Sequence, residues 1–227
     1  MDFSQTIASL IEILWLDLIL SSENAVALAV ATRALPQEQK RLGINLGTVL
    51  FILLRIALAY ALMACAHLPG FGLAGAVLLF WAALATAIRG ETNKAPEIKP
   101  HRGLGAAMAA ALAFDAPGAL INMTAVQGAA QGVKPLVLFG LALSIPLLAL
   151  GSAQFINALR KPPLLWASAG LLGWVAGRMA AADTAVLASA MPPEIMGDFA
   201  PPLGALLAIL LAYGYSRGRK IKRIAEE

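Results

Sequence analysis

Apolar residues along this chain gather into long runs, and short segments rich in proline, glycine or charge separate them. The first run, from Thr6 to Val30, exceeds the ~20 residues that an α-helix needs to cross a hydrocarbon core. The proline-rich segment from Met191 to Pro202 is expected to be a connection. The runs predict seven helices, over about 5–33, 42–66, 71–88, 104–131, 134–158, 163–183 and 200–217. The pattern therefore predicts an all-α fold, a polytopic membrane helix bundle with seven transmembrane helices in one transmembrane domain, 1–227.

Basic residues lie in alternate connections between these predicted helices. The connections after helices two and six have no Lys or Arg, and the one after helix four has only Lys134. Because cytoplasmic loops hold the excess of positive charge, the N-terminus is expected outside and the basic tail, 217–227, in the cytoplasm. The basic residues in the other connections are Arg33, Lys40 and Arg41, then Arg89, Lys94, Lys99 and Arg102, and then Arg160 and Lys161.

Composition agrees with a membrane protein whose main contact is the lipid bilayer. Hydrophobic residues make up 59% of the chain and charged residues 13%, whereas soluble domains carry roughly 25% charged residues. The net charge of +4 is explained by the basic loops and tail, so no nucleic-acid partner is expected. Cys65 is the only cysteine, which excludes an intrachain disulfide and a cysteine metal cluster. The N-terminus has no basic residue before the first apolar run and no recognisable cleavage site, so the first helix is expected to remain.

Two acids interrupt the first apolar run. Asp17 and Glu23 would lie at membrane depth, where a charge costs about 2.5–3.5 kcal/mol and usually serves an ion or a proton. Ser21 and Asn24 share the helical face of Asp17, but Glu23 points about 120° away from it. We therefore predict a helix break near Ser21–Ser22, which would free backbone carbonyls and let Glu23 turn inward.

The fourth predicted helix repeats part of this pattern. Asp115 and Asn122 are seven residues apart, as are Asp17 and Asn24. The loop charges give helices one and four opposite directions, so helices 1–3 (about 5–88) and 4–6 (about 104–183) are predicted to be inverted repeats, with the helix at about 200–217 outside them. A second helix break is predicted at Pro117–Gly118.

The repeat symmetry would bring these polar residues together at the middle of the membrane. The predicted ligands, all with oxygen donors, are Asp17, Glu23, Asn24, Asp115, Asn122 and Ser21. Oxygen ligands suit hard divalent cations such as Mn²⁺, Ca²⁺ or Mg²⁺. Neighbouring carboxylates disfavour one another's ionisation, so the empty site is expected to hold protons and to bind a metal more weakly at low pH. Asp17, Glu23 and Asp115 carry one negative charge more than a divalent ion neutralises, which leaves one carboxylate free to exchange a proton and makes protons a candidate counter-ion. A transported cation, rather than a resident cofactor, is the expected ligand.

Other readings of these residues stay open. The acids are alternatively helix-packing groups whose charge partners are Arg55 and Arg178, the two arginines inside apolar runs. Glu12 suits either an entrance or a solvated helix end, and His67 and His101 fall in loops. A membrane scaffold that docks stress-response or membrane-insertion partners through its basic loops and tail is a second function. An enzyme is not expected, because the chain lacks a convincing nucleophile–base pair or a His-rich site.

Several of these motifs resemble the TerC family of integral membrane proteins, part of the LysE transporter superfamily. The family motif D-x-x-x-S-x-D-N falls on Asp17, Ser21, Glu23 and Asn24, with Glu in place of the second Asp. Its second copy matches at Asp115 and Asn122 only, since Ala119 and Ile121 replace the expected Ser and Asp. The resemblance implies metal-ion export, best supported for manganese in bacterial relatives, from a bacterial inner membrane, and a wider link to tellurite resistance. Further matches are Gly47-Thr48, Arg55, Ser144 to Ser152 and Gly170 to Gly177.

Overall fold

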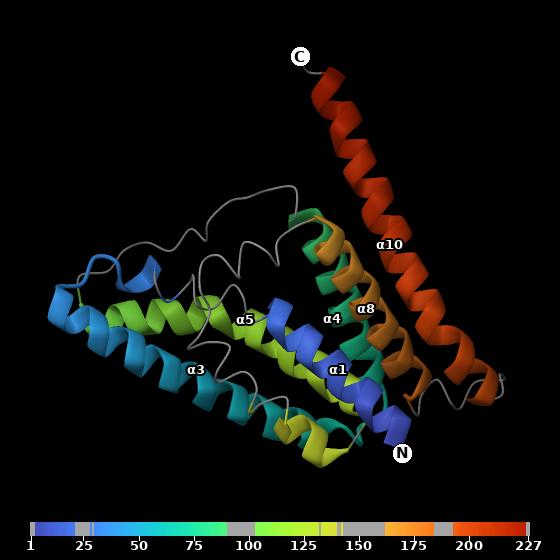
Figure 1. The fold of residues 1–227 in the computed structure, drawn as a ribbon, viewed down its shortest axis with the longest axis horizontal. Coiled ribbons are helices and arrows are strands. Elements are labelled where there is room, and N and C mark those ends of the chain that lie inside the picture. The colour runs from blue at the N-terminus through green and yellow to red at the C-terminus, as the bar shows by residue number, and fades with distance from the viewer. Residues whose placement is uncertain are drawn as a thin grey trace. The chain divides into compact units, whose positions relative to one another are not determined.

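The computed structural model describes residues 3–20, 28, 30–89, 103–131, 133–139, 142, 162–183 and 193–225. Regular structure in these ranges is helical throughout. The principal helices are α1 (Phe3–Leu20), α3 (Gln37–Cys65), α4 (Phe71–Arg89), α5 (Leu104–Ala130), α8 (Pro162–Ala181) and α10 (Pro193–Ala225) (Figure 1).

Four of the described helices are long and apolar enough to cross a membrane, judged by length and composition. They are Gln37–Cys65, Leu104–Ala130, Pro163–Ala181 and Ile195–Tyr215. Helix α4 contributes a shorter apolar stretch, Phe71–Ala87. The helical membrane character predicted from the apolar runs is therefore confirmed, whereas the seven spans remain a prediction. Most of the run predicted at 134–158 lies outside the described residues, although 134–139 are helical.

Helix α10 corrects the prediction of a proline-rich connection before the last helix. It begins at Pro193 and continues through Pro201 and Pro202 to Ala225, so it is longer than the helix expected at about 200–217. Pro193 suits a helix start, because the first helical N–H has no partner within the helix. Pro201 is buried, and the backbone at Ala200 and Pro201 packs closely against Gly177 of α8. This tertiary packing stabilises the helix where two N–H groups are missing.

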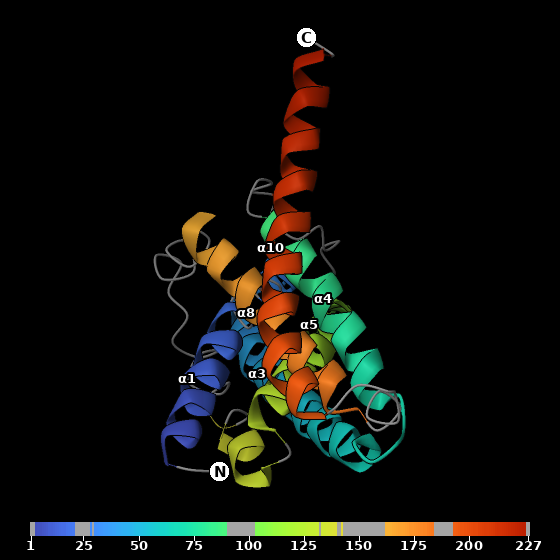
Figure 2. The same cartoon turned by 90° about the vertical axis from the view of Figure 1, so that its right-hand side faces the viewer.

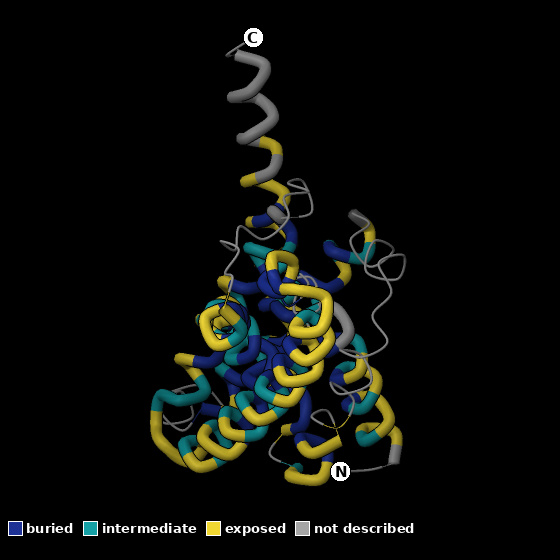
Figure 3. Tube along the Cα trace, turned by 90° about the vertical axis from the view of Figure 1, so that its left-hand side faces the viewer, coloured by how far each residue is buried: buried dark blue, intermediate teal, exposed yellow. Residues whose placement is uncertain are grey.

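The chain divides into two compact units. The first unit comprises 1–64 and 94–157, with α1, α3 and α5, and the second comprises 65–93 and 158–227, with α4, α8 and α10. Around each helix, buried and exposed positions fall on different sides (Figure 3). Each unit therefore has its own interior, and the two interiors differ in chemistry.

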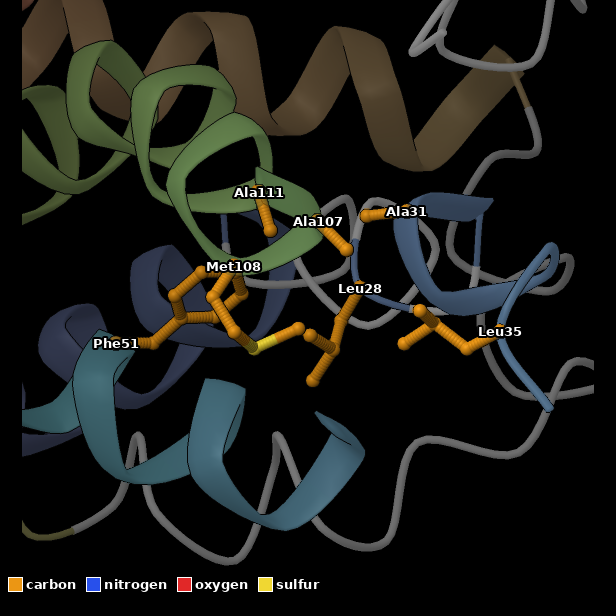
Figure 4. Packing of buried hydrophobic residues seen from close by; sticks show 7 residues of the cluster. All are labelled: Leu28, Ala31, Leu35, Phe51, Ala107, Met108 and Ala111. Atoms are coloured by element: carbon orange, nitrogen blue, oxygen red, sulfur yellow. The ribbon is translucent and has the colours of Figure 1, made fainter. Parts of the chain in front are cut away.

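In the first unit, a hydrophobic cluster holds α3 and α5 together. Figure 4 shows the Met108 side chain of α5 extending between Phe51 of α3 and Leu28. Gly47 of α3 lies so close to Leu28 that an added methyl group would collide with the leucine side chain. The remaining buried members of this cluster are Ala31, Leu35, Ala107 and Ala111.

In the second unit, α8 packs against both α4 and α10 (Figure 2). Gly173 and Gly177 of α8 meet the backbone of α10 directly, at Gly204 and at Ala200. Small residues allow this close approach of the two helix backbones.

Candidate functional site

Asp17 lies near the end of α1, on the face that the helix buries. That face also carries Ser9, Ile13 and Leu16, which the spacing of a helix places beside one another. The Asp17 side chain has no exposed surface. Since α1 packs against α5, this buried face directs the Asp17 carboxylate into the interior of the first unit.

Arg55 reaches the same carboxylate from α3. The buried positions of α3 recur every fourth residue, at Gly43, Gly47, Phe51, Arg55 and Ala59, so the arginine continues a face that is otherwise small or apolar. Its side chain is fully buried, and Arg55 Nη1 lies 3.5 Å from Asp17 Oδ1. The two side chains form a buried ion pair.

Asn122 of α5 contributes a third polar group. Its Nδ2 donates a hydrogen bond of 2.7 Å to Asp17 Oδ1, the oxygen that also faces Arg55. Asn122 is fully buried, as is Asp17. One carboxylate oxygen thus joins α1, α3 and α5.

Asp115 lies two turns before Asn122 on the same buried face of α5. It is only 1% exposed, and neither of its carboxylate oxygens accepts a hydrogen bond within the described part of the chain. Its charge interacts with Arg55, as does that of Asp17. The guanidinium of Arg55 thus pairs with Asp17, and its charge also acts on Asp115. Asp17, Arg55, Asp115 and Asn122 are called the charged cluster, and the formal charges of these four residues sum to −1.

The remaining predicted site residues divide into two groups. Ser21, Glu23 and Asn24 lie outside the described residues, so the break predicted at Ser21–Ser22 and any contribution of Glu23 stay predictions. Arg178 lies on α8 in the second unit. Within the described ranges, no three His, Cys, Asp or Glu side chains are grouped closely enough to hold a metal ion. Any metal site built on the charged cluster therefore needs the amide of Asn122 or groups beyond those ranges.

Two further polar residues considered from the sequence lie within the described ranges. Glu12 is half-buried on α1, and His67 is exposed in the turn after α3. His101 lies outside the described residues.

The helix break predicted at Pro117–Gly118 is wrong. Helix α5 runs without interruption from Leu104 to Ala130 with Pro117 inside it. Pro117 is two residues from Asp115, about 200° around the helix, and lies on the exposed side. The N–H that proline lacks is therefore lost on the outer side of α5, away from the charged cluster.

One further buried acid, which was not among the predicted site residues, lies in the second unit. Asp183, which follows α8, is 5% exposed, and its Oδ1 accepts a hydrogen bond of 3.0 Å from the Gly70 N–H. Its Oδ2 accepts one of 3.1 Å from the Leu73 N–H. Asp183 thus caps the N-terminus of α4, where unpaired N–H groups favour an anion. The two partners are more than a hundred residues away in the chain, so no local pattern signals this role.

Long apolar helices around a buried charged cluster define a helical integral membrane protein with an ionisable interior. The family model described as "Integral membrane protein TerC family" matches residues 3–220. The chain belongs to this family, which is linked to ion and metal transport.

A relative from Bacillus subtilis (strain 168), described as "Uncharacterized membrane protein YjbE", is 36% identical over 176 residues. The similar region covers 77% of this chain and 80% of the relative. No solved structure shows significant similarity to the chain.

Proposed function

We propose that the protein is a secondary transporter that exports a divalent metal cation, with Mn²⁺ favoured and Ca²⁺ a further candidate. The observation that supports this most is the charged cluster, which places two carboxylates and an amide inside the first unit, on helices of a membrane protein. Asp17, Asp115 and Asn122 supply ligands from the described part of the site. Ser21, Glu23 and Asn24 complete the proposed set.

The electrostatics of the cluster favour an ion-binding role. Two carboxylates carry −2, of which Arg55 neutralises half. Buried charge is costly even when it is paired, and replacing a buried pair by apolar residues is often neutral or stabilising. A second acid without a hydrogen bond from the described residues adds to that cost. The charges of Asp17, Asp115 and Arg55 therefore sum to −1, and a net negative charge favours the binding of a cation.

The helix packing supports the proposed inverted repeat. In the repeat, α1 corresponds to α5, and α4 corresponds to α8. The structure packs α1 against α5 within the first unit and α4 against α8 within the second, so equivalent helices lie side by side. A twofold axis in the membrane plane would produce such pairs. The proposed topology places the N-terminus outside a bacterial inner membrane and the C-terminus in the cytoplasm. The proposed counter-ion is the proton.

Metal accumulation in cells tests this function. Cells lacking the protein are complemented with wild type, Asp17→Asn, Asp115→Asn or the exposed control Asp198→Asn, and are challenged with Mn²⁺, Ca²⁺, Mg²⁺, Zn²⁺ and Ni²⁺. Wild type and Asp198→Asn are expected to lower intracellular metal. The two buried variants are expected to reach the membrane but to leave metal high, since an amide keeps the shape and removes the charge.

The same cells separate transport from a scaffold function. Removing the basic tail, 217–227, should leave export intact if the protein is a transporter. A scaffold that docks partners through its tail and basic loops would lose function on truncation and tolerate Asp17→Asn and Asp115→Asn. That pattern would overturn the proposed function.

A further inference from the structure

Within the described part of the chain, Arg55 is a cation that pairs with Asp17 and whose charge also acts on Asp115. We propose that Arg55 is a tethered competitor of the transported ion, which holds Asp17 and Asp115 until a divalent cation displaces its guanidinium. This inference rests on the proposed function of the charged cluster and assigns that site its regulation.

The geometry supports a role as a substitute for a free cation. Arg55 Nη1 is 3.5 Å from Asp17 Oδ1, and the charge of Arg55 also interacts with that of Asp115. The two acids come from α1 and α5, whereas Arg55 comes from α3. One guanidinium therefore contacts the carboxylate of Asp17 on α1, and its charge also acts on the carboxylate of Asp115 on α5.

The surroundings of Arg55 distinguish it from an arginine that reaches a surface. Its neighbours one turn away on α3, Phe51 and Ala59, are buried apolar residues. The guanidinium is thus enclosed, and the ion pair is not screened as a surface pair would be. Such a contact holds the Asp17 carboxylate in one arrangement.

Charge arithmetic then predicts which ions can compete. With Arg55 in place, the two acids and the guanidinium sum to −1. A divalent cation that displaces Arg55 neutralises both carboxylates. A monovalent cation only replaces one positive charge by another, and it must also separate a buried ion pair. Arg55 therefore selects against Na⁺ and K⁺.

Metal binding to the purified full-length protein tests this competitor role. The apparent Kd for Mn²⁺ is measured at pH 8 with and without high NaCl, for wild type, Arg55→Gln and Arg55→Lys. If Arg55 holds the acids in roughly nine molecules of ten, Arg55→Gln should lower the apparent Kd about tenfold. Na⁺ should compete with Mn²⁺ in Arg55→Gln more strongly than in wild type.

Transport measured in proteoliposomes distinguishes a competitor role of Arg55 from a purely structural role. Arg55→Gln should combine a lower KM for Mn²⁺ with a lower maximal rate, because the ion enters easily but nothing displaces it. Loss of a structural contact would instead raise KM or lower the rate alone. Lysine offers one ammonium in place of the planar guanidinium fork, so Arg55→Lys should lie between wild type and Arg55→Gln.

The outcomes decide between the competitor role and the proposed function itself. Unchanged or weaker Mn²⁺ binding by Arg55→Gln, with wild type binding and exporting the ion, would overturn the competitor role alone. If Arg55→Gln is recovered unfolded, Arg55→Lys decides, and an affinity equal to or below that of wild type rejects the role. Wild type that neither binds nor exports Mn²⁺, Ca²⁺ or Mg²⁺ would overturn the proposed function and this inference together.

Discussion

Asp115 in the first unit and Asp183 in the second are both buried acids, but their surroundings differ. Asp183 accepts hydrogen bonds from two backbone N–H groups at the start of α4. Asp115 accepts none from the described residues, and the charge of Arg55, the ion-pair partner of Asp17, acts on it. The fold explains the buried acid that caps a helix, whereas Asp115 lacks such backbone partners among the described residues, which is why the proposed function assigns it to an ion site.

The interiors of the first and second units differ in the same way as these two acids. The second unit is held by close approach of small residues, with Gly173 and Gly177 of α8 against the backbone of α10. The first unit encloses an ion pair, an amide and a second acid among apolar helices. We infer that the second unit serves mainly to support the fold and that the first carries the ion chemistry.

The largest expected effect comes from breaking the packing of the second unit. A methyl group at Gly177 would collide with the Ala200 carbonyl oxygen and lie 2.7 Å from the Ala200 carbonyl carbon. Gly177→Leu should therefore cost about 3 kcal/mol or more and greatly reduce folded protein. Size-exclusion profiles of detergent extracts measure this, with Gly197→Ala on α10, where an added methyl group meets nothing within 4 Å, as the control. Normal yields of Gly177→Leu would contradict the packing described here.

Weakening the cap of α4 should have a smaller effect. Asp183→Asn keeps one acceptor but leaves the second N–H facing an amide donor, which should destabilise the protein by about 1–3 kcal/mol. Thermal unfolding of the purified variant measures the loss. Export by the folded fraction should match that of wild type, and loss of export without loss of stability would show that the second unit also takes part in transport.

The smallest expected effect is a small gain in stability. A methyl group at Gly118, three residues from Asp115, would meet nothing within 4 Å. Gly118→Ala should therefore stabilise α5 by about 0.5–1 kcal/mol and leave export unchanged, since the helix is already continuous there. Slower export by this variant would show that α5 must bend at Gly118 during transport.

Much of the helical fold could be predicted from the sequence, because apolar runs long enough to span a membrane leave few alternatives. The effect of proline could not be predicted. Pro117 lies on an exposed side of α5, and Pro201 is buried close to Gly177, so both helices continue through positions where a break was expected. Whether a proline breaks a helix depends on which side it occupies and on what packs against it, and a single sequence shows neither.

The candidate site was predictable in part. An acid inside an apolar run was a clear signal for Asp17 and Asp115, and the repeat related Asp17 to Asp115 and Asn24 to Asn122. The structure shows a hydrogen bond between Asp17 and Asn122. The repeat could not predict this contact, because it relates Asp17 to Asp115 and Asn122 to Asn24. Arg55 and Arg178 looked alike in sequence, and only the position of α3 beside α1 and α5 identifies Arg55 as the partner of Asp17.

Mn²⁺ flux into or out of proteoliposomes containing Asp115→Asn shows whether the buried Asp115 carboxylate takes part in transport. Wild type and Asp183→Asn, which changes a buried acid in the same way outside the charged cluster, are reconstituted at equal density. Flux is expected for wild type and for Asp183→Asn, and none above empty vesicles is expected for Asp115→Asn. Full flux through folded Asp115→Asn would contradict this expectation and return Asp115 to a purely structural role.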